Sequence, residues 1–302
     1  MKRILTPALM FAIIMSSMSF AVFAVPQPDV VPKTPPAPKF TDAERHAELA
    51  RRRAEVAAKM TENSIMVLFS AEPKLYTNDV DYVFRQENNF YYLTELKQQN
   101  ATLVIRKNAG VGTETLFLPK PDAMLQAVKN RGTFTSKDGR TTITGAPTLY
   151  LLLPEGERDD TGKREFRVED ELSKALTEYK VENAQPIFAD LRQIKSPYEL
   201  KLLQHAIDIT TEAQLRAMAT VGRLNWEYEV QAEVEYTFRR RNADFWGYPS
   251  IVGCGENATT LHYEESQSPV TKGELLLMDV GAEYDHYTAD VTRTFPVNGK
   301  FT

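Results

Sequence analysis

The pattern of apolar and polar positions predicts two kinds of region along this 302-residue chain. Between residues 41 and 185, apolar runs of strand length alternate with helical stretches, which is typical of an α/β domain. The expected strands are 65–69, 90–93, 102–105, 115–118, 149–153 and 186–189, and the expected helices are 41–60, 122–130 and 168–179. We therefore predict an α/β amino-terminal domain over residues 41–185.

A second region, residues 190–302, begins with two strong helix signals. Residues 196–199 combine a serine N-cap, a proline at the first helical position and a glutamate three residues after the cap, so a helix should run from there to about Val221. A second helix should begin after Asn225, with one buried stripe made by Trp226, Val230, Val234 and Phe238. Its acidic residues fall off this stripe and are interpreted as a solvated face rather than as ligands: Glu227, Glu229, Glu233 and Glu235.

The last two apolar runs, from Glu274 to Pro296, predict a β-hairpin that turns at residues 285–286. Each run carries one aspartate, Asp279 or Asp290, although aspartate is depleted in strands. An even-length turn pairs residues whose numbers add to an odd value, so both carboxylates should lie on one face, within reach of one ligand. Two such charges repel each other unless a proton or a cation lies between them. We therefore interpret the pair as half of a metal site.

The first 40 residues predict export followed by a spacer. Residues 1–24 begin with Lys2 and Arg3, continue with an apolar run and end in small residues, which is typical of a secretory signal. An uncleaved membrane anchor is the alternative, because the run is nearly long enough to span a bilayer. Both interpretations place the body of the protein in the periplasm or outside the cell. Residues 25–40 contain six prolines and predict an extended, solvated spacer.

Composition and net charge limit the kinds of function and of stabilisation that this protein can have. The formal net charge is −5, so nothing in the chain favours binding to nucleic acid. Hydrophobic residues make up 42% and charged residues 25%, as in ordinary globular proteins. The single cysteine, Cys254, cannot form an internal disulfide, so stability must come from packing.

Two segments hold further candidate binding residues. Residues 82–93 contain five aromatic side chains around Arg85, which could line a pocket, although a packed core with Arg85 paired to a carboxylate is the more ordinary arrangement. His262 follows a glycine-rich turn and precedes the aspartate hairpin, so it could lie beside Asp279 on an adjacent strand. A purely structural histidine is the alternative.

Four segments, in order along the chain, carry a resemblance to a known family. They are YVFRQENNFYYL at 82–93, RQIKSPYE at 192–199, YPSIVGCGENATTLHY at 248–263, and MDVGAEY at 278–284 with DVTRTFP at 290–296. This combination resembles the Xaa-Pro aminopeptidases (aminopeptidase P), metallopeptidases of the pita-bread fold shared with prolidase, creatinase and methionine aminopeptidase. The resemblance implies that the α/β amino-terminal domain is followed by an α+β pita-bread domain.

The resemblance also implies roles for single residues. Asp279 matches a ligand of one metal ion, and Asp290 matches a ligand that bridges two ions, usually manganese. His262 matches a catalytic histidine that lines the substrate site, and Tyr248 matches a tyrosine near the amino terminus of the bound peptide. A hydroxide between two cations would attack the peptide carbonyl. The implied reaction releases an amino-terminal residue that precedes proline, a tertiary amide bond without an N–H.

The chain departs from the family pattern in several ways. The family's site also needs a histidine and two glutamates downstream of the hairpin, whereas this sequence stops at Thr302. We therefore expect an amino-terminal fragment with an incomplete catalytic domain, a ribbon with few strand partners and no activity alone. His286 is expected to be exposed at the turn tip. Glu95 replaces a common glycine and is expected to affect only a loop.

Two other interpretations stay open. A prolidase or creatinase-like hydrolase would use the same fold, and a dipeptidase would reject tripeptides. A non-catalytic binding module could keep the scaffold, but the retention of Asp279, Asp290 and His262 weighs against it. Peptides containing proline are the expected partners in the leading interpretation. A homo-oligomer is compatible with the sequence, and no residue decides it.

Overall fold

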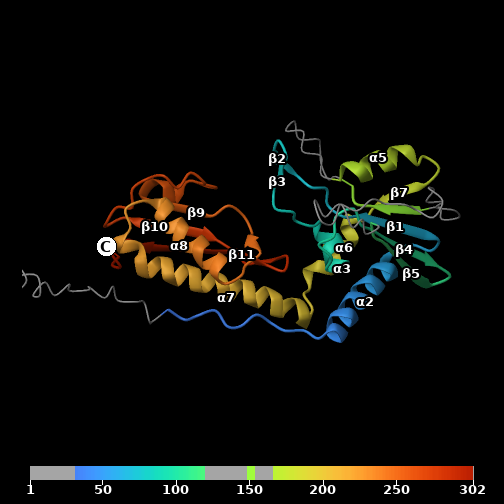
Figure 1. Ribbon diagram of the computed structural model, residues 1–302, viewed down its shortest axis with the longest axis horizontal. Coiled ribbons are helices and arrows are strands. Elements are labelled where there is room, and N and C mark those ends of the chain that lie inside the picture. Colours follow the sequence, from blue (N-terminus) through green and yellow to red (C-terminus); the bar gives the residue numbers. More distant parts are fainter. Residues whose placement is uncertain (1–30, 120–147, 154–165, 302) are drawn as a thin grey trace, which may run out of the picture.

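The computed structural model describes residues 31–119, 148–153 and 166–301, so the expected signal segment and the expected helix at 122–130 lie outside the described residues. Figure 1 shows two halves side by side, with the long helix α7 (Pro197–Thr220) extending from the junction along the second half. Within the described ranges, no helix is both long and apolar enough to cross a membrane.

The first half is a three-layer α/β domain, as predicted. Its mixed five-stranded sheet has the order β5-β4-β1-β6-β7, with β1 parallel to β6 and antiparallel to β4. Helices α2, α3 and α6 pack on the face that presents Met66 and Leu68, and α5 packs on the opposite face. The strands are β1 (Ser64–Phe69), β4 (Thr102–Asn108), β5 (Val111–Phe117), β6 (Thr148–Leu151) and β7 (Lys180–Asn183), and the helices are α2 (Asp42–Lys59), α3 (Asn88–Thr94), α5 (Arg167–Ala175) and α6 (Gln185–Gln193). A small hairpin, β2 (Leu75–Thr77) with β3 (Val80–Asp81), extends from this domain.

Two of the expected strands are helices. Residues 90–93 lie in α3, whose first turn is capped by the Glu87 carboxylate, which accepts hydrogen bonds from the backbone N–H groups of Asn89 and Phe90. Residues 186–189 lie in α6, where proline occupies the first turn. A short apolar run has no period of its own, so its conformation is decided by caps and by the neighbours it packs against.

The second half places two helices against two small sheets. Helix α7 begins with the predicted capping box, in which Ser196 and Glu199 exchange side-chain to backbone hydrogen bonds, and α8 (Glu227–Arg240) follows the short 3-10 helix η1 (Val221–Arg223). One sheet has the order β13-β10-β9 and the other β12-β11-β8. The strands are β8 (Phe245–Trp246), β9 (Ile251–Cys254), β10 (Leu275–Val280), β11 (Ala282–Tyr284), β12 (Tyr287–Thr288) and β13 (Val291–Pro296), and η2 (Gly255–Thr259) follows β9.

The predicted hairpin is confirmed with one register along its whole length. Asp279 lies opposite Thr292, and Tyr284 lies opposite Tyr287, across a two-residue turn. The turn residues Asp285 and His286 have φ angles of 52° and 66°, as a type I′ turn requires. The expectation of a ribbon with few partners was wrong, because β10 lies between β13 and β9, and β11 also pairs with β8.

The described part of the proline-rich segment, residues 31–40, is anchored rather than free. It runs along α7 in Figure 1. The backbone N–H and the hydroxyl of Thr34 both donate to the Glu212 carboxylate at 2.7 Å, and the Phe40 ring stacks on Tyr198 with centroids 3.9 Å apart. Most of the side chains of these residues are exposed, as expected for a solvated segment, but the contacts of Thr34 and Phe40 with α7 were not expected.

Candidate functional site

Asp279 and Asp290 lie on the same face of the hairpin, as the register argument predicts. The Tyr248 hydroxyl lies between them, 2.5 Å from Oδ1 of Asp279 and 3.2 Å from Oδ1 of Asp290. Burial, followed by the hydrogen bond to Asp279, raises the pKa of Tyr248, so its hydroxyl keeps its proton. The hydroxyl hydrogen therefore lies between two negatively charged carboxylates and reduces the repulsion between them. The structure thus brings together three of the four residues singled out from the sequence.

A glycine allows this close approach. A Cβ on Gly281 would lie 1.7 Å from the backbone oxygen of Ala289 and 3.1 Å from the Tyr248 ring. The backbone N–H of Gly247 donates to the Gly281 oxygen at 2.8 Å, which fixes Tyr248 beside the hairpin. A side chain at position 281 would therefore separate the tyrosine from the two carboxylates.

The donor set fits a divalent cation only in part. Two carboxylates and a phenol are hard oxygen donors of the kind that Mg²⁺, Mn²⁺ and Ca²⁺ prefer. Among the described residues, no group of three or more histidine, cysteine, aspartate or glutamate side chains is arranged to hold a metal ion. The pair can therefore supply some ligands of a metal shell, and the individual roles given to Asp279 and Asp290 stay predictions.

His262 has no recorded hydrogen bond to this cluster. It is exposed, with a φ angle of 53°, on the turn after η2. Its neighbour Tyr263 is buried, and the Tyr263 hydroxyl donates to Glu227 at 2.8 Å. The structure records no hydrogen bond from His262 to either aspartate, so its place beside Asp279 and its catalytic role stay predictions.

Glu227 is a residue whose importance the sequence interpretation missed. It is completely buried, and its carboxylate accepts hydrogen bonds from Cys254 N, Asn257 Nδ2, Tyr263 Oη and Ser268 N at 2.7 to 3.1 Å. The expectation of a solvated glutamate is therefore wrong here. Position 227 precedes Val230 by three residues, so it belongs to the buried stripe, and helical spacing could have placed it there. Glu227 holds both ends of the loop that carries His262.

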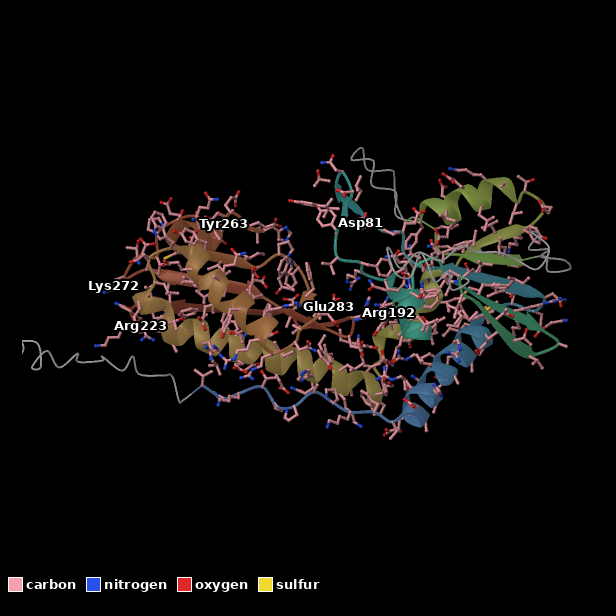
Figure 2. All side chains as sticks on the ribbon, viewed as in Figure 1. Asp81, Arg192, Arg223, Tyr263, Lys272 and Glu283 are labelled. Atoms are coloured by element: carbon pink, nitrogen blue, oxygen red, sulfur yellow. The ribbon has the colours of Figure 1, made fainter. Side chains whose placement is uncertain are left out.

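The hairpin tip lies against the first half of the molecule. Arg85 donates to both carboxylate oxygens of Glu283 at 2.8 to 3.1 Å, which confirms the expected pairing of Arg85 with a carboxylate. The Tyr91 hydroxyl donates to Asp285. The His286 ring stacks on Tyr91 with centroids 3.8 Å apart. Figure 2 shows Glu283 near the junction of the two halves.

Two expectations at this junction were wrong. His286 is half-buried rather than exposed, and burial, with the nearby cations Arg85 and Lys97, lowers its pKa to about 3. Glu95 does more than occupy a loop. It ends α3 with a φ angle of 51°, which explains why glycine suits this position, and its carboxylate pairs with Arg45 of α2.

The comparisons with known proteins agree with this architecture. Residues 49–152 match the aminopeptidase P amino-terminal domain, and residues 201–302 match metallopeptidase family M24. The chain is 34% identical over 265 residues to the Xaa-Pro aminopeptidase of Haemophilus influenzae, covering 84% of this chain and 62% of that protein. It is 30% identical over 278 residues to the Xaa-Pro aminopeptidase of Escherichia coli, covering 84% of this chain and 63% of that protein.

Solved structures show the same similarity. Aminopeptidase P from Escherichia coli, with the inhibitor Pro-Leu, has a TM-score of 0.72 and 27% identity over 85% of this chain and 63% of its own. Proline aminopeptidase P II from Yersinia pestis has a TM-score of 0.70 and 26% identity over 85% of this chain and 64% of its own. The chain thus spans less than two thirds of the length of these relatives.

Proposed function

Because the chain belongs to the aminopeptidase P branch of metallopeptidase family M24, we propose that it acts in the metal-dependent release of an amino-terminal residue that precedes proline. The observation that carries the proposal is the Tyr248 hydroxyl held between Asp279 and Asp290. The family implies divalent metal ions. We propose that the ions are two Mn²⁺ ions, which Asp279 and Asp290 would help to hold.

Each residue of the site would have a separate task in this reaction. When bound, the ions would polarise the scissile carbonyl and supply the hydrolytic water. Asp279 in β10 and Asp290, directly before β13, would hold these ions from two neighbouring segments of the hairpin. Tyr248, whose hydroxyl lies between Asp279 and Asp290, would lie near the amino terminus of the bound peptide. His262 would orient the scissile bond from the loop that Glu227 holds.

The proposed partners are peptides with proline in the second position. The bond before proline is a tertiary amide, so a hydrolase that accepts it cannot rely on the missing N–H for recognition. The proposed location is the periplasm or the exterior of the cell, on the strength of the signal-like residues 1–24. A homo-oligomer is compatible with the proposal.

The test compares hydrolysis of Ala-Pro-Ala, Ala-Ala-Ala and the dipeptide Ala-Pro by protein made from the complete coding sequence, with Mn²⁺ present and after chelation. We expect cleavage of Ala-Pro-Ala alone, lost after chelation. Asp279→Asn and Asp290→Asn should each lower the rate by about 100-fold or more. Asp190→Asn, which alters an exposed ion pair with Lys59, is the matched control and should leave the rate unchanged.

Two results would contradict the proposal. Cleavage of Ala-Pro with rejection of the tripeptide would assign a dipeptidase instead. Full activity after chelation would exclude the metal. We expect no measurable turnover by the 302-residue chain alone, because the described residues place only two acidic ligands together.

A further inference from the structure

A cavity of about 510 Å³ lies at the junction of the two halves. The hairpin tip forms one wall, and residues of α2, α3 and the α6–α7 connection form the others. The cavity lining reaches Thr288, two residues before Asp290, but it includes neither Asp279 nor Asp290. The volume is in the range of small-molecule sites, about 300 to 1,000 Å³.

Arg52 gives this cavity an unsatisfied positive donor. The residue is 1% exposed. Its Nε donates to Glu48 and its Nη1 donates to the backbone oxygen of Tyr92, each at 2.9 Å, whereas its Nη2 has no hydrogen-bond partner. A buried N–H of a charged group without an acceptor costs free energy. An acceptor that enters the cavity next to Arg52 would recover that cost.

Two further cations line the cavity without a carboxylate partner among the described residues. Arg192 donates only to the side-chain oxygen of Asn89, at 2.9 Å, and Lys195 only to a backbone oxygen, at 3.3 Å. Figure 2 shows Arg192 at the junction of the two halves. Glu283 already accepts both donors of Arg85. Neither Arg192 nor Lys195 forms a salt bridge among the described residues, although Arg192 interacts electrostatically with the Glu87 carboxylate. Both cations can therefore donate hydrogen bonds to a ligand.

The acidic residues of the cavity already have hydrogen-bond donors. Glu95 pairs with Arg45, Asp285 accepts from Tyr91, and Glu199 accepts from Tyr287 at 3.0 Å and from the N-cap of α7 at 2.9 Å. These carboxylates would repel a dianion such as phosphate more strongly than a monoanion. The rings of three tyrosines, at positions 91, 92 and 287, offer walls for an apolar group.

We propose that this cavity binds a small organic monocarboxylate, with its carboxylate against Arg52, Arg192 and Lys195 and its apolar body between the tyrosine rings. A carboxylate offers two acceptor oxygens in a plane, which suits guanidinium donors. The site is separate from the aspartate pair and does not depend on the proposed peptidase activity. It would place a ligand in contact with both halves of the molecule at once.

The test is isothermal titration calorimetry on the whole 302-residue chain with phenylacetate as the probe. 2-Phenylethanol, which has the same ring and no charge, and inorganic phosphate are the comparison probes. We expect saturable binding of phenylacetate and at least about tenfold weaker binding of both others, as loss of a charge-assisted hydrogen bond implies.

Three variants test whether phenylacetate binds in this cavity. Arg192→Met should weaken phenylacetate binding about tenfold. Lys195→Met, at an exposed position that leaves the packing intact, should weaken it in the same direction. Arg239→Met, a matched loss of an exposed charge on α8, should leave it unchanged. The unfolding midpoint of each variant shows whether it is folded. If Arg192→Met does not fold, the binding measured with Lys195→Met tests the proposal instead.

Three outcomes would overturn the proposal. They are the absence of saturable phenylacetate binding, equal binding of 2-phenylethanol, and unchanged binding in the folded variants that lack a cavity cation. Tighter binding of phosphate than of phenylacetate would overturn the carboxylate assignment. A tenfold loss in Arg192→Met together with an unchanged Arg239→Met would support it.

Discussion

His286 illustrates how one side chain can report on a junction between two parts of a molecule. Its ring stacks on Tyr91, and its pKa is lowered to about 3 by burial first and by Arg85 and Lys97 second. An unfolded histidine has a pKa of about 6.5. The unfolded chain therefore binds this proton first as the pH falls. The contribution of His286 to stability is complete above about pH 6.5 and is lost between there and about pH 3.

His286→Phe should make stability less sensitive to acid. Phenylalanine keeps a ring for the stack on Tyr91 but binds no proton. The free energy of unfolding of this variant should fall less between pH 7 and pH 4.5 than that of the wild type, as measured by urea denaturation. Part of the dependence should remain, because burial also lowers the pKa of His205. His46→Phe, on the exposed surface of α2, is the control. An equal loss in all three proteins would show that the His286 ring titrates freely.

At the scale of elements, α8 holds a long loop through one carboxylate. Glu227 joins β9, η2 and the segment before β10 by four hydrogen bonds. All four donors point at the two oxygens of one buried group. The loop conformation between residues 254 and 268 therefore depends on an acceptor at position 227.

Glu227→Gln should destabilise the protein although the side chains have nearly the same shape. The amide nitrogen would face donors rather than acceptors, which should cost about 3 kcal/mol of unfolding free energy. Glu235→Gln changes a half-exposed side chain that contacts only Gln231, and it should cost less than about 0.5 kcal/mol. Urea denaturation measures both. Equal stability of the two variants would mean that the loop does not need the charge.

The sequence predicts best those helices and strands that have a capping motif, a defined turn or a clear period of apolar residues. The capping box at Ser196 and Glu199 specifies α7, and the strand alternation with a two-residue turn specifies the hairpin register and the shared face of Asp279 and Asp290. Residues 90–93 and 186–189 have no hydrophobic period of their own, since a run of four apolar residues fits a strand or a helix. Their helical state depends on the Glu87 cap and on burial of Phe188.

Part of the site could not be read from the sequence, because it depends on contacts between distant segments. Nothing near Tyr91 indicates that Asp285 and His286 lie against it, almost 200 residues later. The position of Tyr248 between the aspartates likewise requires Gly281, whose closeness to Ala289 appears only in the folded ribbon. Glu227 is the exception. Its helical spacing from the buried Val230 was enough to predict that Glu227 is buried, but the sequence interpretation placed it on the solvated face.

At the scale of the whole molecule, the two halves meet through few but buried interactions. The bidentate pair of Arg85 and Glu283 is central, because the Glu283 side chain is only 5% exposed. Lys97 adds an exposed ion pair with Asp244, which contributes little. The pair of Arg85 and Glu283 therefore adds to the hydrogen bond of Tyr91 with Asp285 and to the stack of Tyr91 with His286.

Arg85→Met should separate the unfolding of the two halves. It leaves the Glu283 carboxylate buried without its partner, at a cost of about 3 kcal/mol. We expect calorimetry to show two transitions where the wild type shows one. Arg106→Met, at an exposed position on β4, should leave the single transition intact. One unshifted transition in Arg85→Met would show that the halves are held together by other contacts.

The tie between Thr34 and Glu212 has a consequence for the order in which the chain acquires its structure. The two residues are 178 positions apart, so residues 31–40 cannot dock until α7 exists. A chain that emerges from its amino end can complete the α/β sheet first, because that sheet ends at β7. The first described segment should therefore be among the last to be immobilised, long after it has left the ribosome.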